Sequence, residues 1–310
     1  MPEYRKLRKR HSILDLCHDP ALAATVTLQP VARLGVDAAI LFADILLPFE
    51  PLRLGLRFAA GEGPIIDRPI TNAADVDRLP TFNVEAELGY VLDAVRHARR
   101  ALPAAVPLIG FAGAPFTLAS YAIEGGASRT FTKTKQFMYG APDAWHRLLG
   151  KLAELVGQYL AAQARNGAAA LQIFDSWIGC LSPDDYRTYV QEHSRRALSL
   201  ASASGVPVIH FGTGTATFLE DFAAAGGDVI SVDWRIPLDA AWDRIGTRAI
   251  QGNLDPAALL APASERDARV RDILTRARKK PGHIFNLGHG VLPETDVDAV
   301  RAVVDLVHGA

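Results

Sequence analysis

Short apolar runs alternate along the chain with longer, amphipathic stretches. The runs, such as Ala-Ala-Leu-Gln-Ile-Phe and Pro-Val-Ile-His-Phe, are apolar nearly throughout and close on small or polar residues such as Gly, Asp, Ser or His. Continuous apolar character is typical of strands that are buried on both faces of a parallel sheet. The predicted strands are residues 37–42, 107–113, 169–175, 207–212, 229–233, 249–253 and 283–287.

The stretches between these runs have the residue spacing of helices. The clearest cover residues 84–102, 139–166, 183–204 and 293–308, and several open with Pro or follow a Ser, Thr or Asp cap. Strand and helix therefore alternate, which predicts an α/β fold with a parallel sheet. Seven such units do not close an eight-stranded barrel, because strand number, tilt and stagger are linked. Either one unit is missing or the sheet is open.

The whole chain, 1–310, is predicted to form one domain. Its 310 residues are 49% hydrophobic and contain no internal repeat beyond the βα period, no low-complexity stretch and no linker. A polar stretch at 61–83 is predicted to be a long loop over one mouth of the sheet. Long loops in that position are often functional. Within it, residues 64–68 have the pattern of a short extra strand outside the barrel.

Charge and cysteine content limit the possible partners. A formal net charge of −1 gives no reason to expect general binding to nucleic acid or to an anionic membrane. The two cysteines, Cys17 and Cys180, are too few for a disulfide framework and fit a reducing cytoplasm. The charged first ten residues lack the apolar core of a signal peptide, and no apolar run is long enough to span a bilayer. We therefore expect a cytoplasmic protein.

Chemistry in parallel α/β folds is located at the C-terminal ends of the strands, which directs attention to the polar residues there. The candidates are Asp44, the segment 110–121, Asp175, Ser176, His210, Asp233, Trp234, Asn253, Asp255 and His289. Each also has a structural interpretation. Asp44, Asp175 and Asp233 could equally cap a turn or pair with a buried arginine. Ser176 is more typical of a helix start, and His210 of a core histidine.

Three further candidates differ in strength. His289 lies between two glycines, where the backbone can approach a ligand closely, which favours a functional role. Tyr121 fits either a binding site or the core. The Gly-Thr-Gly-Thr run at 212–215 resembles a phosphate-binding turn, but a helix cap is the better interpretation.

Metal and nucleophile motifs are missing from the sequence. Neither cysteine has a His or Cys neighbour at ligand spacing, and His-Glu-x-x-His and Gly-x-Ser-x-Gly do not occur. Taken alone, the residues predict only an α/β enzyme with an anion-tolerant cleft that contains no metal.

The segment 110–126, Gly-Phe-Ala-Gly-Ala-Pro-Phe-Thr-Leu-Ala-Ser-Tyr-Ala-Ile-Glu-Gly-Gly, resembles throughout the long signature of the uroporphyrinogen decarboxylase family. Other family-like segments stand in the same order at 28–30, 37–46, 171–177 and 285–293, so the resemblance covers essentially the whole chain. It implies a (β/α)8 TIM-type barrel that, without a cofactor, removes carbon dioxide from the four acetate arms of uroporphyrinogen III. The implied product is coproporphyrinogen III, in heme biosynthesis, and the implied assembly is a homodimer.

The resemblance also assigns roles to residues. It implies that Asp44 is the catalytic carboxylate, which accepts hydrogen bonds from the four pyrrole N–H groups. Tyr121, Ser176 and His289 match residues that hold the carboxylate arms, and Phe111 and Phe174 match apolar residues near the macrocycle. Arg5 and Arg8 match basic residues just after the first strand, and Arg8 is the one of the two that is expected to reach the cleft.

One departure from the family stands at the N-terminus. Members carry a strand of the form Pro-x-Trp-x-Met-Arg-Gln-Ala-Gly-Arg, whose two arginines bind substrate carboxylates, whereas this chain begins directly after it at Met-Pro-Glu-Tyr-Arg. We therefore expect a chain truncated before that motif, seven βα units instead of eight, and a weakened decarboxylase.

Two alternatives remain. One is a pseudoenzyme that binds tetrapyrrole without turnover. The other is a zinc- and corrinoid-using methyltransferase of the same fold, which is disfavoured because its His-x-Cys site is replaced here by His210-Phe-Gly.

Overall fold

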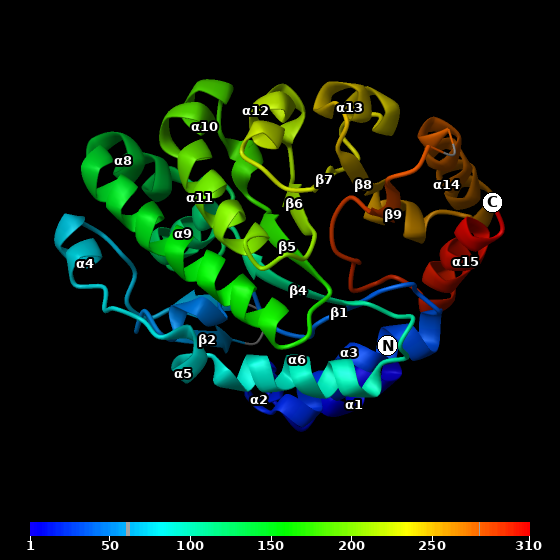
Figure 1. Cartoon of the computed structure of the whole chain (residues 1–310), viewed down its shortest axis with the longest axis horizontal. Coiled ribbons are helices and arrows are strands. Elements are labelled where there is room, and N and C mark those ends of the chain that lie inside the picture. Colours follow the sequence, from blue (N-terminus) through cyan, green and yellow to red (C-terminus); the bar gives the residue numbers. More distant parts are fainter. Residues whose placement is uncertain (60–62, 279) are drawn as a thin grey trace.

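The computed structural model describes residues 1–59, 63–278 and 280–310. Its centre is a seven-stranded sheet whose strands are neighbours in chain order and whose pairings are all parallel (Figure 1). Each strand overlaps a predicted one. The strands are β1 (Ala39–Ile40), β4 (Leu108–Gly113), β5 (Ala170–Asp175), β6 (Val208–Gly212), β7 (Val229–Ser231), β8 (Ala249–Leu254) and β9 (His283–Leu287).

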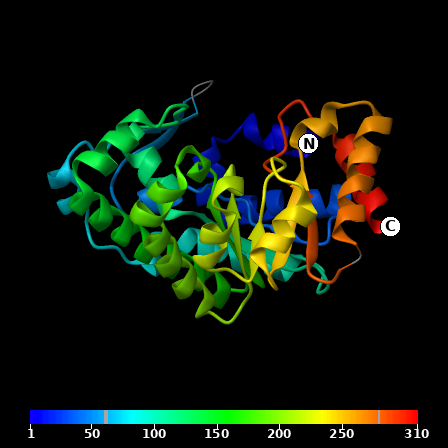
Figure 2. The same ribbon diagram turned by 90° about the horizontal axis from the view of Figure 1, so that it is seen from above.

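Helices lie around the outside of the curled sheet (Figures 1 and 2). They are α1 (Pro2–Arg8), α2 (Ile13–His18), α3 (Pro20–Leu34), α4 (Ala73–Asp77), α5 (Val84–Glu87), α6 (Gly89–Ala101), α7 (Pro115–Glu124), α8 (Thr132–Gly140), α9 (Pro142–Arg165), α10 (Pro183–Tyr189), α11 (Gln191–Ser202), α12 (Leu219–Ala224), α13 (Leu238–Ile245), α14 (Ala263–Ala277) and α15 (Val297–His308). Short 3-10 helices are η1 (Leu47–Phe49), η2 (Ile178–Cys180), η3 (Thr215–Thr217) and η4 (Pro256–Leu260).

Three predicted helices are each divided in two by the fold. The break in 84–102 falls at Leu88, that in 139–166 between Gly140 and Pro142, and that in 183–204 at Val190. Pro142 explains the second break, because proline restricts the residue before it and is tolerated best in the first turn of a helix. At the other two breaks, Leu88 and Val190 leave the helical conformation, with φ of −115° and −129°, although the apolar spacing continues.

The helices at the two ends of the sheet, α3 and α15, contact each other, whereas, in the described part of the chain, the two edge strands, β1 and β9, are not paired with each other. Helix α15 packs against α3, and His308 Nε2 lies 3.0 Å from the Asp37 carboxylate (Figure 1). Within the described residues, β1 pairs with β4 alone and β9 with β8 alone. Ile40 on β1 and Ile284 on β9 are accordingly 46% and 42% exposed. The prediction of a TIM-type α/β barrel with seven βα units is confirmed.

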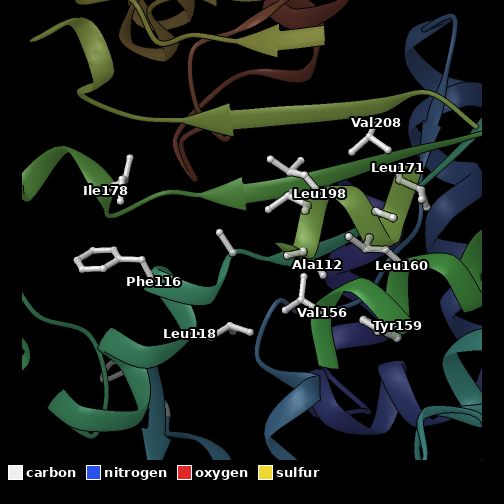
Figure 3. Close-up of a cluster of buried hydrophobic side chains, with 14 of the residues drawn as sticks. Ala112, Phe116, Leu118, Val156, Tyr159, Leu160, Leu171, Ile178, Leu198 and Val208 are labelled. Carbon is white, nitrogen blue, oxygen red and sulfur yellow. The ribbon is translucent and has the colours of Figure 1, made fainter. Parts of the chain in front are cut away.

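The main core lies between the outer face of the sheet and helices α7, α9 and α11 (Figure 3). Leu171 and Ile173 on β5 point into it, while Gln172 between them faces the inside of the barrel, where it accepts a hydrogen bond from Gln251 of β8. Fully burying one such apolar side chain stabilises the fold by about 1.5 to 3 kcal/mol. The core thus fixes β4 and β5, whose ends carry part of the candidate site. None of the helices in the described ranges combines the length and the apolar character needed to cross a membrane.

A hairpin and a short helix lie outside the barrel. The hairpin pairs β2 (Leu56–Ala59) with β3 (Gly63–Ile66) and confirms the predicted short extra strand near 64–68. The predicted loop 61–83 begins with residues 61 and 62, which lie outside the described residues. The rest is more ordered than predicted: the backbone N–H groups of Ile66 and Ile70 donate to carbonyls of α7 and its C-cap, and α4 packs against α9.

Candidate active site

Asp44 lies just beyond the C-terminal end of β1, between that strand and η1. The half-buried side chain is turned back on its own loop, where Oδ1 accepts a hydrogen bond from Leu46 N at 2.8 Å. Burial raises the pKa of the Asp44 carboxyl, and the bond from Leu46 partly offsets that rise. A carboxylate in such surroundings interacts strongly with any positive charge that develops beside it.

Tyr121 on α7 faces the same space as Asp44. Burial, with a further contribution from the Asp44 carboxylate, raises the pKa of Tyr121 to about 12, so the hydroxyl stays protonated and can donate a hydrogen bond. The phenol ring stacks on Trp177, with ring centroids 3.8 Å apart, and Phe131 packs edge-on against the same indole at 5.0 Å. Trp177 and Phe131 therefore hold Tyr121 in place, a role that the sequence did not reveal.

A row of aromatic rings crosses the ends of three neighbouring strands. Phe111 on β4 lies 5.5 Å from Phe174 on β5, which lies 5.4 Å from Phe211 on β6. The row continues to the ring of His289, at 6.0 Å from Phe211. It forms an apolar wall suited to a large, flat-sided ring system. Phe211 was missed in the sequence, although the strand register places it directly opposite Phe174.

Ser176 and His289 lie at the ends of β5 and β9. The Ser176 carbonyl accepts a hydrogen bond from Thr213 Oγ1 at 2.5 Å, which ties the end of β5 to the β6 loop. His289 Nδ1 accepts from Gly290 N at 2.6 Å, so in the neutral ring the proton is on Nε2. Desolvation and the nearby Arg235 guanidinium lower the pKa of His289, which keeps the ring neutral near pH 7.

The two N-terminal arginines differ in their surroundings. Both lie on α1, a helix without buried residues. Arg8 is half-buried beside Tyr4, whose ring packs 5.8 Å from that of Phe42 at the end of β1. Arg5 is exposed. Arg8 is thus linked through Tyr4 to the segment that carries Asp44.

Two other candidates from the sequence, His210 and the 212–215 run, have structural roles and not roles in binding. His210 is completely buried on the outer face of β6, stacked 3.7 Å from Phe222, and burial lowers its pKa to about 3. The Gly-Thr-Gly-Thr run is a cap, because Gly214 has a φ of 67° and precedes η3. His210 and the cap thus agree with the structural interpretations favoured from the sequence. Within the described ranges, no group of three or more His, Cys, Asp or Glu residues could hold a metal ion.

Asp175 is buried behind the site. Its Oδ1 accepts a hydrogen bond from Thr117 Oγ1 at 2.8 Å, and Thr117 Oγ1 in turn accepts one from Trp177 N at 3.3 Å. Asp175 thereby links the end of β5 to α7, the helix that carries Tyr121. Burial raises the pKa of Asp175 from 3.8 to about 7.

This raised pKa predicts a dependence of stability on pH. Between about pH 4 and pH 7 the unfolded carboxyl is ionised while the folded one stays protonated, so the native protein loses stability as the pH rises. Asp175→Asn can still accept from Thr117 but carries no charge. We expect its free energy of unfolding, relative to the unchanged protein, to gain about 2 to 3 kcal/mol between pH 5 and pH 8. Urea unfolding at both pH values measures this. Asp143→Asn, on the exposed first turn of α9, is the control, and an equal gain there would contradict the assignment.

Comparison with known proteins gives a consistent result. Residues 1–310 match a family model described as uroporphyrinogen decarboxylase (URO-D). A uroporphyrinogen decarboxylase from Sorangium cellulosum is 57% identical over 309 residues, which cover 99% of this chain and 88% of the relative. One from Solibacter usitatus is 54% identical over 308 residues, covering 99% and 89%. Among solved structures, a methyltransferase from Methanosarcina mazei superposes with a TM-score of 0.82 over 95% of this chain and 87% of its own. Its 19% identity means that this likeness concerns the fold alone.

Proposed function

The chain belongs to the uroporphyrinogen decarboxylase family, and from that premise we propose that it converts uroporphyrinogen III to coproporphyrinogen III by releasing carbon dioxide from the four acetate arms. The observation that carries this proposal is the position of Asp44, a half-buried carboxylate beside Tyr121 at the end of β1. A fixed negative charge is what the reaction needs at its most difficult point.

Each decarboxylation breaks the bond between the acetate methylene and its carboxylate. The electron pair of that bond needs an acceptor, and the pyrrole ring can supply one once a ring carbon has been protonated and the ring has become cationic. After carbon dioxide leaves, a proton adds to the former methylene to give a methyl group, and the ring gives up its extra proton. A carboxylate at the ring nitrogens stabilises the cationic stage. We assign that role to Asp44.

The neighbouring residues fit the rest of the substrate. The aromatic row of Phe111, Phe174 and Phe211 offers an apolar wall for the macrocycle and excludes water, which strengthens the electrostatic effect of Asp44. Tyr121 and His289 offer neutral donors to the carboxylate arms. We also propose that Ser176 and Arg8 bind arms, with Arg5 in a weaker role.

Anaerobic incubation with uroporphyrinogen III tests this function. After oxidation, chromatography separates the porphyrins by their number of carboxylates, and we expect a progression from eight to four. Binding of the tetrapyrrole without loss of carboxylates would contradict the decarboxylase and favour the pseudoenzyme. The methyltransferase alternative gains no support from the site, since His210 stacks on Phe222 at the outer face of the sheet.

We further propose that the protein acts as a homodimer in the cytoplasm. The family resemblance supports the dimer, and the two free cysteines, Cys17 and Cys180, support a reducing compartment. Light scattering that gives the mass of one chain at assay concentrations would contradict the dimer.

A further inference from the structure

A buried carboxylate, Asp233, joins the ends of three strands. Only 2% of Asp233 is exposed, and its Oδ2 accepts a hydrogen bond from Gly214 N, beyond β6, at 2.7 Å. Its Oδ1 accepts from Arg235 N at 3.0 Å, and its carbonyl accepts from Asn253 Nδ2 of β8 at 2.9 Å. The segment after β7 is therefore bonded to the segments on both sides of it, and these bonds fix the backbone of Arg235.

The side chain of Arg235 is oriented by two contacts. Its Nη1 forms an ion pair with Asp233, and its guanidinium lies over the ring of Trp234, 4.4 Å from the centroid. Even so, 52% of the side chain is exposed. A guanidinium carries five N–H donors, so an ion pair through one nitrogen leaves donors for a ligand. Two backbone N–H groups already donate to the Asp233 carboxylate. The carboxylate therefore has hydrogen-bond partners without the Arg235 side chain, whose exposed donors remain for a ligand.

The loop after β9 presses directly against this segment. A Cβ atom on Gly288 would lie only 2.8 Å from Trp234 N and 3.0 Å from the Cα of Asp233, so no other residue fits there without displacing the backbone. Gly288 N also donates to the Leu254 carbonyl at 2.7 Å. This close approach sets His289, the next residue, near the Arg235 guanidinium, and the effect of that charge on the pKa of His289 agrees with the placement. His289 also touches the aromatic row through Phe211.

We propose that Arg235 is a further substrate-binding residue, which holds one carboxylate arm of the tetrapyrrole together with His289. The inference rests on the proposed function and extends it to a residue outside the family-like segments. Arginine suits the task because its planar fork matches a carboxylate, while His289 Nε2–H adds a neutral donor from the loop after β9. Asp233 pre-orients the fork, so little conformational entropy is lost when the arm binds.

Besides lying near His289, Arg235 lines a hollow of about 460 Å³ between the β7–α13 loop and α14. Its α14 wall carries both signs of charge, already paired: Arg269 Nε lies 2.7 Å from Glu265, and Arg276 Nε 2.7 Å from Asp272. Those carboxylates oppose a further negative group.

The test compares Arg235→Gln with the unchanged protein in steady-state turnover of uroporphyrinogen III. Hydrogen bonds to charged groups predict a KM about tenfold higher, with kcat changed less than about twofold. Arg235→Lys keeps the charge without the fork, and we expect a KM between the other two. Arg269→Gln is the matched control, since that arginine pairs with Glu265 within α14, and its KM should not change.

A second measurement does not depend on turnover. In an NMR titration of the imidazole signals, Arg235→Gln should raise the pKa of His289, because the positive charge that lowers it is gone. An unchanged KM for Arg235→Gln, or a fall in kcat and thermal stability without a change in KM, would overturn the inference and leave the proposed function standing. If the unchanged protein neither bound nor converted uroporphyrinogen, both would fall together.

Discussion

Asp44→Ala is expected to lower kcat for uroporphyrinogen III by about 100- to 1,000-fold, the usual cost of removing one group that stabilises charge in a transition state. Asp44 is half-buried beside Tyr121, where little water can replace the lost carboxylate. KM should change much less, because the interaction is strongest when the ring is cationic. Asp44→Asn keeps the shape without the charge and should lose nearly as much. Anaerobic single-turnover and steady-state assays measure both variants.

The opposite end of the same strand supplies the control. Asp37 precedes β1, is 86% exposed and pairs with His308 on α15. Asp37→Asn removes a carboxylate from the same segment of chain without touching the cleft, so its kcat should equal that of the unchanged protein. If Asp44→Ala retained full turnover, the assignment of the catalytic carboxylate would be wrong. Burial raises the pKa of Asp44, so activity should also fall at a higher pH on acidification than for an ordinary aspartate.

Phe116→Ala is expected to lower the free energy of unfolding by about 3 to 5 kcal/mol, the range for deleting a fully buried aromatic ring. Phe116 lies on α7 with no exposed surface and packs 6.0 Å from Trp145 of α9, within the core drawn in Figure 3. The cavity left behind cannot close easily, because both helices are held between the sheet and their neighbours. Urea unfolding followed by circular dichroism measures the change.

An exposed aromatic residue of the same region provides the comparison. Tyr139 on α8 is 50% exposed and donates a hydrogen bond to Asp185 at 2.9 Å. Tyr139→Ala should cost less than about 1 kcal/mol, since surface substitutions rarely cost more. Equal losses for the two variants would mean that the core between α7 and α9 is not a major source of stability.

The strands could be predicted from the sequence because a strand buried on both faces is apolar almost throughout. Residues 169–175 and 207–212 are apolar almost throughout, and the structure places β5 and β6 within them. The helix breaks were less accessible. The apolar period of residues 84–102 runs through Leu88 without interruption, so the pattern could not show that α5 and α6 are separate.

The candidate site was only partly visible in the sequence. Strand ends pointed to Asp44, Tyr121, Ser176 and His289, and the family-like segments gave each of them an expected role. Trp177, Phe211 and Arg235 escaped notice, for a common reason: each acquires its role from a partner far along the chain. Trp177 stacks on Tyr121, Phe211 stands opposite Phe174, and Arg235 is near His289.

The sequence by itself determined the parallel α/β class, the seven strands and the family, because apolar period and local motifs are properties of neighbouring residues. Only the tertiary structure decided which side chains meet. Parallel register sets Phe174 opposite Phe211, and a close backbone approach at Gly288 brings His289 to Arg235. Such contacts depend on how strands align and how closely loops pack, and no local spacing along the chain encodes either.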